Sequence, residues 1–223
     1  MAKQIIIISG GRLGEAAFYQ KRLAGMLNFL VVCCDGGVRH LDKLNIKPDV
    51  IIGDMDSVSR VELEKREEAG AQIKRYPREK DASDTQLALA YALSLKPDAM
   101  EIWGALGGRI DHALANVFLL DWADKKGATA KLIDEYCEVF LVKKEAVFHN
   151  AEGQTVSIFA LDEKAAGVSL SGFQYHLDNE TLAADSSHGI SNFIIDSPAT
   201  ITVQAGKLLV IHYWQQDIFP EAD

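Results

Sequence analysis

Residues 29–57 read FLVVCCDGGVRHLDKLNIKPDVIIGDMDS, and this stretch predicts the fold of the first half of the chain. Two apolar runs, Phe29–Cys34 and Val50–Ile52, stand on either side of a short segment with helical spacing. Neither run alternates with polar residues, which is typical of strands buried on both faces of a parallel sheet. An aspartate, Asp35 or Asp54, follows each run within two residues. The stretch therefore predicts a strand–helix–strand unit with carboxylates at the ends of its strands.

The same alternation of strands and helices continues on both sides of that unit. Apolar runs predict further strands over Ile5–Ile8, Ile73–Tyr76 and Met100–Trp103. Helical spacing is found over Glu15–Leu27, Val38–Leu44, Val58–Ala69, Ser83–Leu95 and Asp111–Lys125. Ser83 and Gln86 have the spacing of a capping box, so a helix is expected to begin there. The first half is therefore expected to be an α/β domain with a mainly parallel sheet, whose strand ends share one edge.

After Gly127 the pattern changes to short strand-like pieces with no comparable helical segment. These pieces are Thr155–Ala160, Val168–Leu170, Asn192–Ile195, Thr200–Val203 and Leu208–Tyr213. They predict a second, antiparallel β-sandwich domain. We place the boundary between residues 1–127 and 128–223, and residues 131–142 could extend the sheet of either domain.

Composition excludes several functional classes. The chain has 223 residues, with 23 Lys and Arg against 32 Asp and Glu, a formal net charge of −9. An acidic balance argues against a nucleic-acid-binding surface, which needs a basic stripe. No apolar run approaches the roughly 20 residues that cross a bilayer, and the start enters a strand without a signal peptide, so a cytoplasmic protein is expected. The three cysteines form neither a disulfide framework nor a zinc motif.

Clustered carboxylates are the main chemical feature of the sequence. Four acidic motifs occur in order, at Cys34–Gly37, Gly53–Ser57, Lys80–Thr85 and Gly107–His112. Carboxylates that lie together repel one another and are costly to desolvate unless a cation compensates. Mg²⁺ is the usual partner of all-oxygen ligands and commonly bridges phosphates. The motifs therefore indicate a metal-assisted phosphate site.

Each motif also has a purely structural interpretation. Asp54 and Asp56 suit metal ligation, but an Asp-rich turn could also cap the next helix. Asp81 and Asp84 could likewise be helix caps that stabilise the helix dipole. Two such motifs at strand edges together favour metal binding.

The glycine-rich motif at residues 107–112 adds a cationic group. Gly107 and Gly108 let the backbone approach a ligand, and the Arg109 guanidinium suits phosphate oxygens, although a plain turn with a solvated arginine is the alternative. Lys80 and Arg12 could supply further cations. Asp111 and His112 could orient a hydroxyl or a metal-bound water, although a lone histidine is more often structural.

Several common catalytic motifs are missing from the sequence. It contains no P-loop, and Gly10-Gly11-x-x-Gly14 is not a complete dinucleotide fingerprint. No nucleophile elbow is present either. A nucleotide, if used, would be bound without a Walker lysine.

The four motifs together, in this order and spacing, resemble the thiamine pyrophosphokinase family of the bacterial type. The fourth motif continues as Gly107-Gly108-Arg109-x-Asp111-His112-x-x-x-Asn116, and Gly189-Ile190-Ser191-Asn192 looks like the motif of that family's second domain. The resemblance covers nearly the whole chain.

The resemblance implies a fold, a reaction and an assembly. It implies an N-terminal α/β catalytic domain that binds ATP and Mg²⁺, and a C-terminal β-sandwich that binds thiamine. It implies transfer of the terminal two phosphates of ATP to the hydroxyethyl oxygen of thiamine, leaving AMP. It also implies a homodimer, with thiamine held between the first domain of one subunit and the second domain of its partner.

The resemblance also implies roles for single residues. Asp54, Asp56 and Asp84 would hold Mg²⁺, with Asp81 nearby. ATP would be bound by Asp35, Gly36, Gly37, Lys80, Gly107, Gly108 and Arg109, with Lys80 and Arg109 at its phosphates. Asp111 would face thiamine and complete a catalytic set with Asp54, Asp56 and Asp84. Ser191 and Asn192 would contact thiamine.

The identity of the acceptor alcohol is less constrained than the metal site. An aromatic side chain is expected against the thiamine pyrimidine, and Tyr175, Phe193 and Trp214 are the candidates. Phe193 stands where many bacterial relatives are expected to have a glutamate. A pyrophosphokinase acting on another alcohol such as a hydroxymethylpterin, a metal-dependent phosphohydrolase, and a non-catalytic nucleotide-binding module are the alternatives.

Overall fold

The structure is a computed structural model that describes residues 4–79 and 81–214. The chain divides into two compact units, Met1–Glu135 and Tyr136–Asp223. This division comes later than the boundary expected after residue 127, because strand β6 (Ala130–Ile133) pairs with strand β5 (Ala99–Trp103) of the first unit. The ambiguous residues 131–142 are thus divided between the units, since β7 (Cys137–Val142) belongs to the second.

The first unit alternates strands and helices. Its remaining elements are β1 (Gln4–Ile8), α1 (Ala16–Ala24), β2 (Phe29–Cys34), a 3₁₀ turn (Asp35–Gly37), α2 (Val38–Leu44), β3 (Val50–Gly53), α3 (Arg60–Glu68), β4 (Gln72–Arg75), α4 (Asp84–Ser94) and α5 (Ile110–Lys125). The predicted strand Phe29–Cys34 and helix Val38–Leu44 are confirmed to the residue. The predicted start of α4 is confirmed as well, because Ser83 Oγ accepts a hydrogen bond from the Gln86 backbone N–H at 3.2 Å.

The strands of the first unit follow the order β6-β5-β1-β2-β3-β4, and every pair is parallel. The strand β1 is central, and its residues Ile5–Ile8 are all buried, as expected for a strand covered on both faces. From β1 the chain runs outward through β2, β3 and β4, and then returns to place β5 on the other side of β1. The crevice between β1 and β5 is therefore the topological switch point of the sheet, where ligands bind in such folds.

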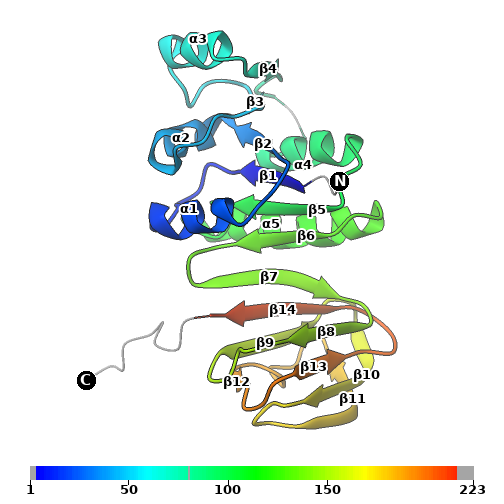
Figure 1. Ribbon diagram of the computed structural model, residues 1–223. Helices are drawn as coiled ribbons and strands as arrows, with labels where there is room; N and C mark the ends of the chain where they lie inside the picture. The colour runs from blue at the N-terminus through cyan, green and yellow to red at the C-terminus, as the bar shows by residue number, and fades with distance from the viewer. Residues whose placement is uncertain (1–3, 80, 215–223) are drawn as a thin grey trace, which may run out of the picture. The chain divides into compact units, whose positions relative to one another are not determined.

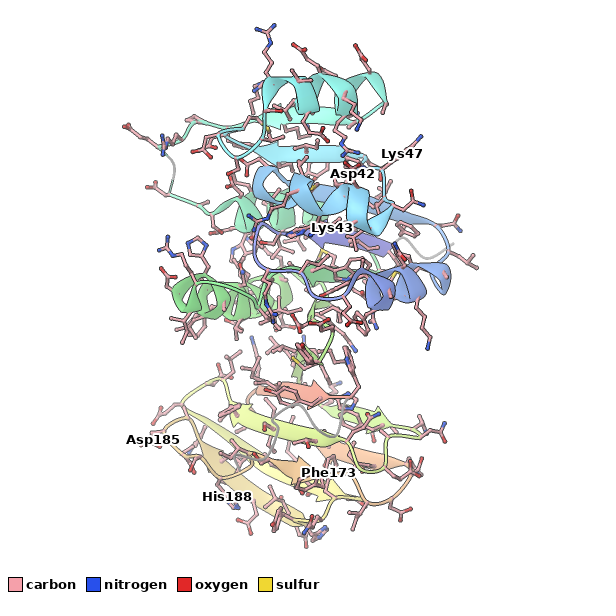
Figure 2. The ribbon with its side chains drawn as sticks, turned by 90° about the vertical axis from the view of Figure 1, so that its left-hand side faces the viewer. Asp42, Lys43, Lys47, Phe173, Asp185 and His188 are labelled. Carbon is pink, nitrogen blue, oxygen red and sulfur yellow. The ribbon has the colours of Figure 1, made fainter. Side chains whose placement is uncertain are left out.

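Helices cover both faces of this sheet (Figure 1). The helices α1 and α2 pack against each other on one face, and α4 and α5 pack against each other on the opposite face. Figure 2, turned by 90°, shows α1 and α5 on opposite sides of the strands. The loops at the carboxyl ends of the strands thus remain open to a ligand.

The second unit consists of strands and short turns. Besides β7 they are β8 (Glu145–Phe148), β9 (Thr155–Ala160), β10 (Lys164–Ser171), β11 (Leu177–Ala183), β12 (Asn192–Phe193), β13 (Ala199–Thr202) and β14 (Leu208–Tyr213). They form two antiparallel layers, in the orders β12-β9-β14-β7 and β11-β10-β13-β8. Side chains of both layers share one hydrophobic core. The predicted α/β plus antiparallel β-sandwich fold is confirmed.

Two edge strands of the second unit, β8 and β11, were not expected from the sequence. Only Phe148 of β8 is buried, and β11 has four consecutive exposed residues, 178–181. Neither strand has the apolar alternation by which strands are recognised. In the part of the chain that the structure describes, no helix is both long and apolar enough to cross a membrane.

Candidate functional site

A cavity of about 970 Å³ opens at the carboxyl edge of the parallel sheet. Its walls come from the loops after β1, β2, β3 and β5, together with the first turns of α4 and α5. Most of the residues expected at the nucleotide site line it, namely Asp35, Gly36, Asp54, Asp84, Gly107, Gly108 and Arg109. Segments that lie far apart in the sequence therefore meet at the switch point.

Glycines allow these loops to pack backbone against backbone. A Cβ on Gly11 would lie 2.4 Å from the carbonyl oxygen of Gly104 and 2.6 Å from that of Gly107. A Cβ on Gly37 would lie 2.4 Å from the carbonyl oxygen of Ile8. Gly37 itself is buried and does not line the cavity, so its visible role is packing rather than contact with phosphate.

Three carboxylates lie together at the cavity, which Asp35 and Asp54 line and Asp56 does not. Oxygen atoms of Asp35, Asp54 and Asp56 all lie within 4.8 Å of one another. Asp54 and Asp56 are predicted at the metal and Asp35 at the ATP, whereas the structure puts Asp35 directly beside the other two. A set of carboxylate oxygens at this spacing fits a hard divalent cation such as Mg²⁺.

Asp35 is the buried member of this cluster, with 2% of its surface exposed. Its Oδ1 accepts a hydrogen bond from the Gly36 N–H at 2.6 Å, and its Oδ2 accepts one from the Met55 N–H at 3.1 Å. Burial raises the pKa of Asp35 above its ordinary value, and the nearby Asp84 and Asp54 carboxylates raise it further, against the lowering effect of the Gly36 hydrogen bond. A bound cation would compensate for the negative charge gathered here.

Asp56 lies at the exposed side of the cluster. Its Oδ1 accepts a hydrogen bond from Ser57 Oγ at 3.1 Å, and its Oδ2 lies 3.6 Å from Nη2 of Arg78. The Asp56 N–H in turn donates to Asp54 Oδ1 at 3.1 Å, which keeps the two side chains on the same turn.

The acidic motif at residues 80–85 is only partly at the cavity. Asp84 is the first residue of α4 and lines the cavity, whereas Asp81 is exposed and does not line it. The first turn of α4 is also tied to the loop after β1, because Ser9 Oγ and Thr85 Oγ1 are hydrogen-bonded at 2.7 Å. Lys80, predicted to bind phosphate, lies outside the described residues.

Arg109 and Asp111 form a two-pronged ion pair. Arg109 Nε and Nη2 donate to Asp111 Oδ1 and Oδ2 at 3.1 and 2.5 Å. The hydrogen bond from Arg109 lowers the pKa of Asp111 to about 2. Both side chains are exposed, and Arg109 lines the cavity whereas Asp111 does not.

Asn116, the last residue of this motif, is buried and donates to the carbonyl of Ala105 at 2.9 Å, which fixes the loop after β5.

Helix α2 contributes basic residues that the sequence analysis did not select. Arg39, His40 and Lys43 line the cavity, and Figure 2 shows Lys43 on α2. Arg39 Nη2 donates to the carbonyls of Gly10 and Gly11, and His40 Nε2 donates to the Gly11 carbonyl at 2.8 Å. The sequence contains a signal for these residues. They come soon after Asp35-Gly36-Gly37, and Arg39 and Lys43 are four residues apart, so they lie on the same face of one helix. The cavity therefore has an acidic wall and a basic wall.

The two residues expected to contact thiamine lie in the second unit. Ser191 is exposed, in a left-handed conformation with φ of 53°, and its N–H donates to Ser157 Oγ at 3.0 Å. Asn192 is buried, and its side-chain amide is hydrogen-bonded to backbone. Ser191 thus offers its hydroxyl to solvent, whereas Asn192 faces the protein.

These features define a class of protein. It is a two-domain chain in which an α/β unit carries an acidic and basic ligand cavity at the switch point of its parallel sheet, followed by an antiparallel β-sandwich. The family model described as thiamin pyrophosphokinase, catalytic domain, matches residues 27–132, and the model described as thiamin pyrophosphokinase, vitamin B1 binding domain, matches residues 140–208.

Individual relatives agree with the family models. The thiamine pyrophosphokinase of Bacillus subtilis (strain 168) is 32% identical over 179 residues, covering 79% of this chain and 84% of the relative. A crystal structure of thiamine pyrophosphokinase from Bacillus subtilis superposes with a TM-score of 0.82 at 28% identity, over 94% of this chain and 98% of that one. The structure from Geobacillus thermodenitrificans gives 0.79 at 26% identity, over 98% and 100%. The chain belongs to the thiamine pyrophosphokinase family, as the ordered motifs predict.

Proposed function

We propose that this chain catalyses the Mg²⁺-dependent transfer of a diphosphate group from ATP to thiamine, giving thiamine diphosphate and AMP. The observation that carries the proposal is the cluster of Asp35, Asp54 and Asp56, two of which line a cavity whose other wall is basic. The family membership of the chain supports the reaction, and the vitamin B1 binding match over residues 140–208 favours thiamine over a pterin alcohol.

The reaction exchanges one P–O bond for another. The hydroxyethyl oxygen of thiamine forms a bond to the β-phosphorus of ATP, and the bond from that phosphorus to the oxygen bridging to the α-phosphorus breaks. The electron pair leaves with AMP, and the hydroxyl proton passes to solvent. Little covalent chemistry is required of the protein, so positioning and charge neutralisation supply most of the catalysis.

Named residues supply that positioning. Asp54, Asp56 and Asp84 would hold Mg²⁺, with Asp35 bracing the cluster and Asp81 close in sequence. When bound, Mg²⁺ neutralises phosphate charge. Arg109, with the Gly107–Gly108 backbone and Gly36, would bind phosphate oxygens, because a guanidinium matches their geometry. Asp111, once released from Arg109, would face the acceptor, and Ser191 would donate to thiamine from the second domain.

The assembly and location form part of the proposal. Family membership supports a homodimer in which thiamine is shared between subunits. A reducing, cytoplasmic location is supported by three buried cysteines, Cys33, Cys34 and Cys137, none of which is in a disulfide.

The test is product analysis by mass spectrometry after mixing the protein with ATP, Mg²⁺ and thiamine. Thiamine diphosphate and AMP in equal amounts are expected, with no product when Mg²⁺ is removed by chelation. ADP or free phosphate without a thiamine product would replace the proposal by a phosphohydrolase. Omitting thiamine is the matched control and should leave ATP intact.

A further inference from the structure

The Asn192 side chain is hydrogen-bonded to both polar groups of the Tyr175 backbone, 17 residues away in the sequence, and we call this pair of bonds the bracket. Its Oδ1 accepts a hydrogen bond from the Tyr175 N–H at 2.9 Å, and its Nδ2 donates to the Tyr175 carbonyl at 2.7 Å. The same Oδ1 accepts from the Phe193 N–H at 3.0 Å. With 3% of its surface exposed and its amide used on backbone, Asn192 has little left to offer a ligand directly.

This bracket extends a short antiparallel ladder by one step. Phe173 and Ile194 form a β-bridge, and the Gln174 N–H donates to the Phe193 carbonyl at 2.8 Å. The next residue, Tyr175, is paired by the Asn192 amide in place of a backbone partner. The backbone of Tyr175 is therefore held at both of its polar groups.

The ring of Tyr175 is presented to solvent at this fixed point. Tyr175 is 60% exposed. It lines a hollow of about 230 Å³ together with Leu177, His188, Ile190 and Asn192. Figure 2 labels His188 on this part of the second unit. The hollow is smaller than the roughly 300–1,000 Å³ of complete small-molecule sites, so it suits one ring of a ligand rather than a whole substrate.

The loop at residues 187–190, which also lines the hollow, is fixed as well. The Ile158 N–H donates to the Gly189 carbonyl at 2.9 Å, and a Cβ on Gly189 would lie 2.8 Å from the Ile158 side chain. The Ser191 N–H is held by Ser157 Oγ. A hollow lined by a fixed loop and by an aromatic residue with a fixed backbone loses little entropy when a flat ring enters it.

The two other aromatic candidates are placed differently. Phe193 is 41% exposed but does not line the hollow. Trp214 packs edge-on to His212, with ring centroids 6.0 Å apart, and its backbone N–H donates to the Tyr136 carbonyl. Of these three candidates, Tyr175 is therefore the one that lines the hollow.

We propose that the Tyr175 ring packs against the flat heteroaromatic ring of the acceptor, and that Asn192 is a positioning residue that acts through Tyr175 rather than by touching the acceptor. This inference rests on the proposed function, because thiamine supplies the flat pyrimidine ring. It assigns the specificity for an aromatic acceptor to a residue outside the Gly189–Asn192 motif.

The decisive experiment is a double-mutant cycle on the full chain, read as the KM for thiamine and, separately, the KM for ATP. Loss of stacking on a base is expected to raise the KM for thiamine about 5- to 150-fold in Tyr175→Ala, with the KM for ATP unchanged within about twofold. Tyr175→Phe keeps the ring and should stay near wild type. Asn192→Ala should resemble Tyr175→Ala, and the double variant should be no worse than Tyr175→Ala, because both changes remove the same interaction.

Two controls accompany the cycle. Ser169→Ala removes a comparable side-chain-to-backbone hydrogen bond, the 2.9 Å bond from the Asn179 N–H, between two residues that do not line the hollow, and should leave the KM for thiamine unchanged. Phe193→Ala tests the competing aromatic and should likewise have little effect.

A second readout does not depend on turnover. Hydrogen exchange at the Tyr175 amide should be faster in Asn192→Ala than in wild type, since that N–H loses its acceptor. If wild type makes no thiamine diphosphate, the proposed function fails, while faster exchange still supports the bracket. The inference is overturned if Tyr175→Ala leaves the KM for thiamine unchanged, if the two effects multiply in the double variant, or if Tyr175 exchange is unaffected in Asn192→Ala.

Discussion

The backbone N–H of Met55 donates a hydrogen bond to Asp35 Oδ2 across 3.1 Å, which joins the loop after β2 to the loop after β3. Met55 adopts a left-handed conformation with φ of 67°, an uncommon state for a residue with a side chain. Gly53 leaves the space that Asp35 occupies, because a Cβ there would lie 2.6 Å from the Asp35 carboxyl carbon. Asp35 therefore shapes the turn that carries Asp54 and Asp56.

Asp35→Asn should lower turnover by about 100-fold or more while the protein stays folded. The amide can accept only one of the two N–H bonds that the carboxylate accepts, so the turn shifts, and a misplacement of about 1 Å is enough for such a loss. Measurement of kcat as a function of Mg²⁺ concentration, with circular dichroism as the check on folding, tests this. Wild-type activity at saturating Mg²⁺ would show that Asp35 does not brace the cluster.

Asp56→Asn should lower turnover by about three orders of magnitude without lowering the melting temperature of the metal-free protein. Removing one of three close carboxylates relieves repulsion, and the exposed contact with Arg78 at 3.6 Å is worth only about 0–1 kcal/mol. Steady-state kinetics and thermal unfolding are the measurements. Glu64→Gln, an exposed carboxylate on α3 that pairs with Arg60, is the control and should change neither quantity. A large drop in melting temperature would mean that Asp56 supports the fold rather than the metal.

Gly11→Ala should reduce the free energy of unfolding by about 1–3 kcal/mol, the usual range for forcing extra volume into a packed site. The added methyl would meet two carbonyl oxygens of the β5 loop, which belong to backbone and cannot rotate away. Urea unfolding measures the change. Gly25→Ala is the matched control, because its φ is −87° and its nearest neighbour would lie 3.5 Å away, so its stability should stay within about 0.5 kcal/mol of wild type.

His40 should make the stability of the protein depend on pH below neutrality. Burial lowers the pKa of His40 in the folded state below its ordinary value of 6.5, and the Arg39 and Lys43 charges act in the same direction, against the hydrogen bond to Gly11. The unfolded chain therefore binds a proton first as the pH falls, and the stability that neutral His40 contributes above pH 6.5 is lost on acidification.

The comparison of wild type with His40→Gln isolates this effect. The glutamine keeps a donor for the Gly11 carbonyl but does not titrate between pH 5 and 8. The difference in unfolding free energy, wild type minus variant, should fall as the pH is lowered from 7.5 to 5. A difference that stays constant over this range would contradict the assignment.

Local patterns were sufficient for much of this molecule. The runs Ile5–Ile8 and Phe29–Cys34 predict buried parallel strands because a strand covered on both faces has no polar side. The capping pair Ser83 and Gln86 predicts the start of α4 because its hydrogen bond is made within four residues. The ordered motifs were enough to assign the family. Strands β8 and β11 escaped prediction because edge strands can be held by backbone pairing with few buried side chains.

Relationships between distant residues were decided only by the tertiary structure. The sequence shows that Asp35 and Asn192 stand in chemically informative motifs, but their partners, Met55 and Tyr175, are 20 and 17 residues away. The basic wall built by Arg39, His40 and Lys43 depends on how α2 packs beside the loop after β1. Residue types and spacing thus determined the buried strands, the start of α4 and the acidic motifs, since these follow from local physics. Which of those carboxylates and amides face a ligand, and which hold the backbone, follows from the packing of segments that no local pattern relates.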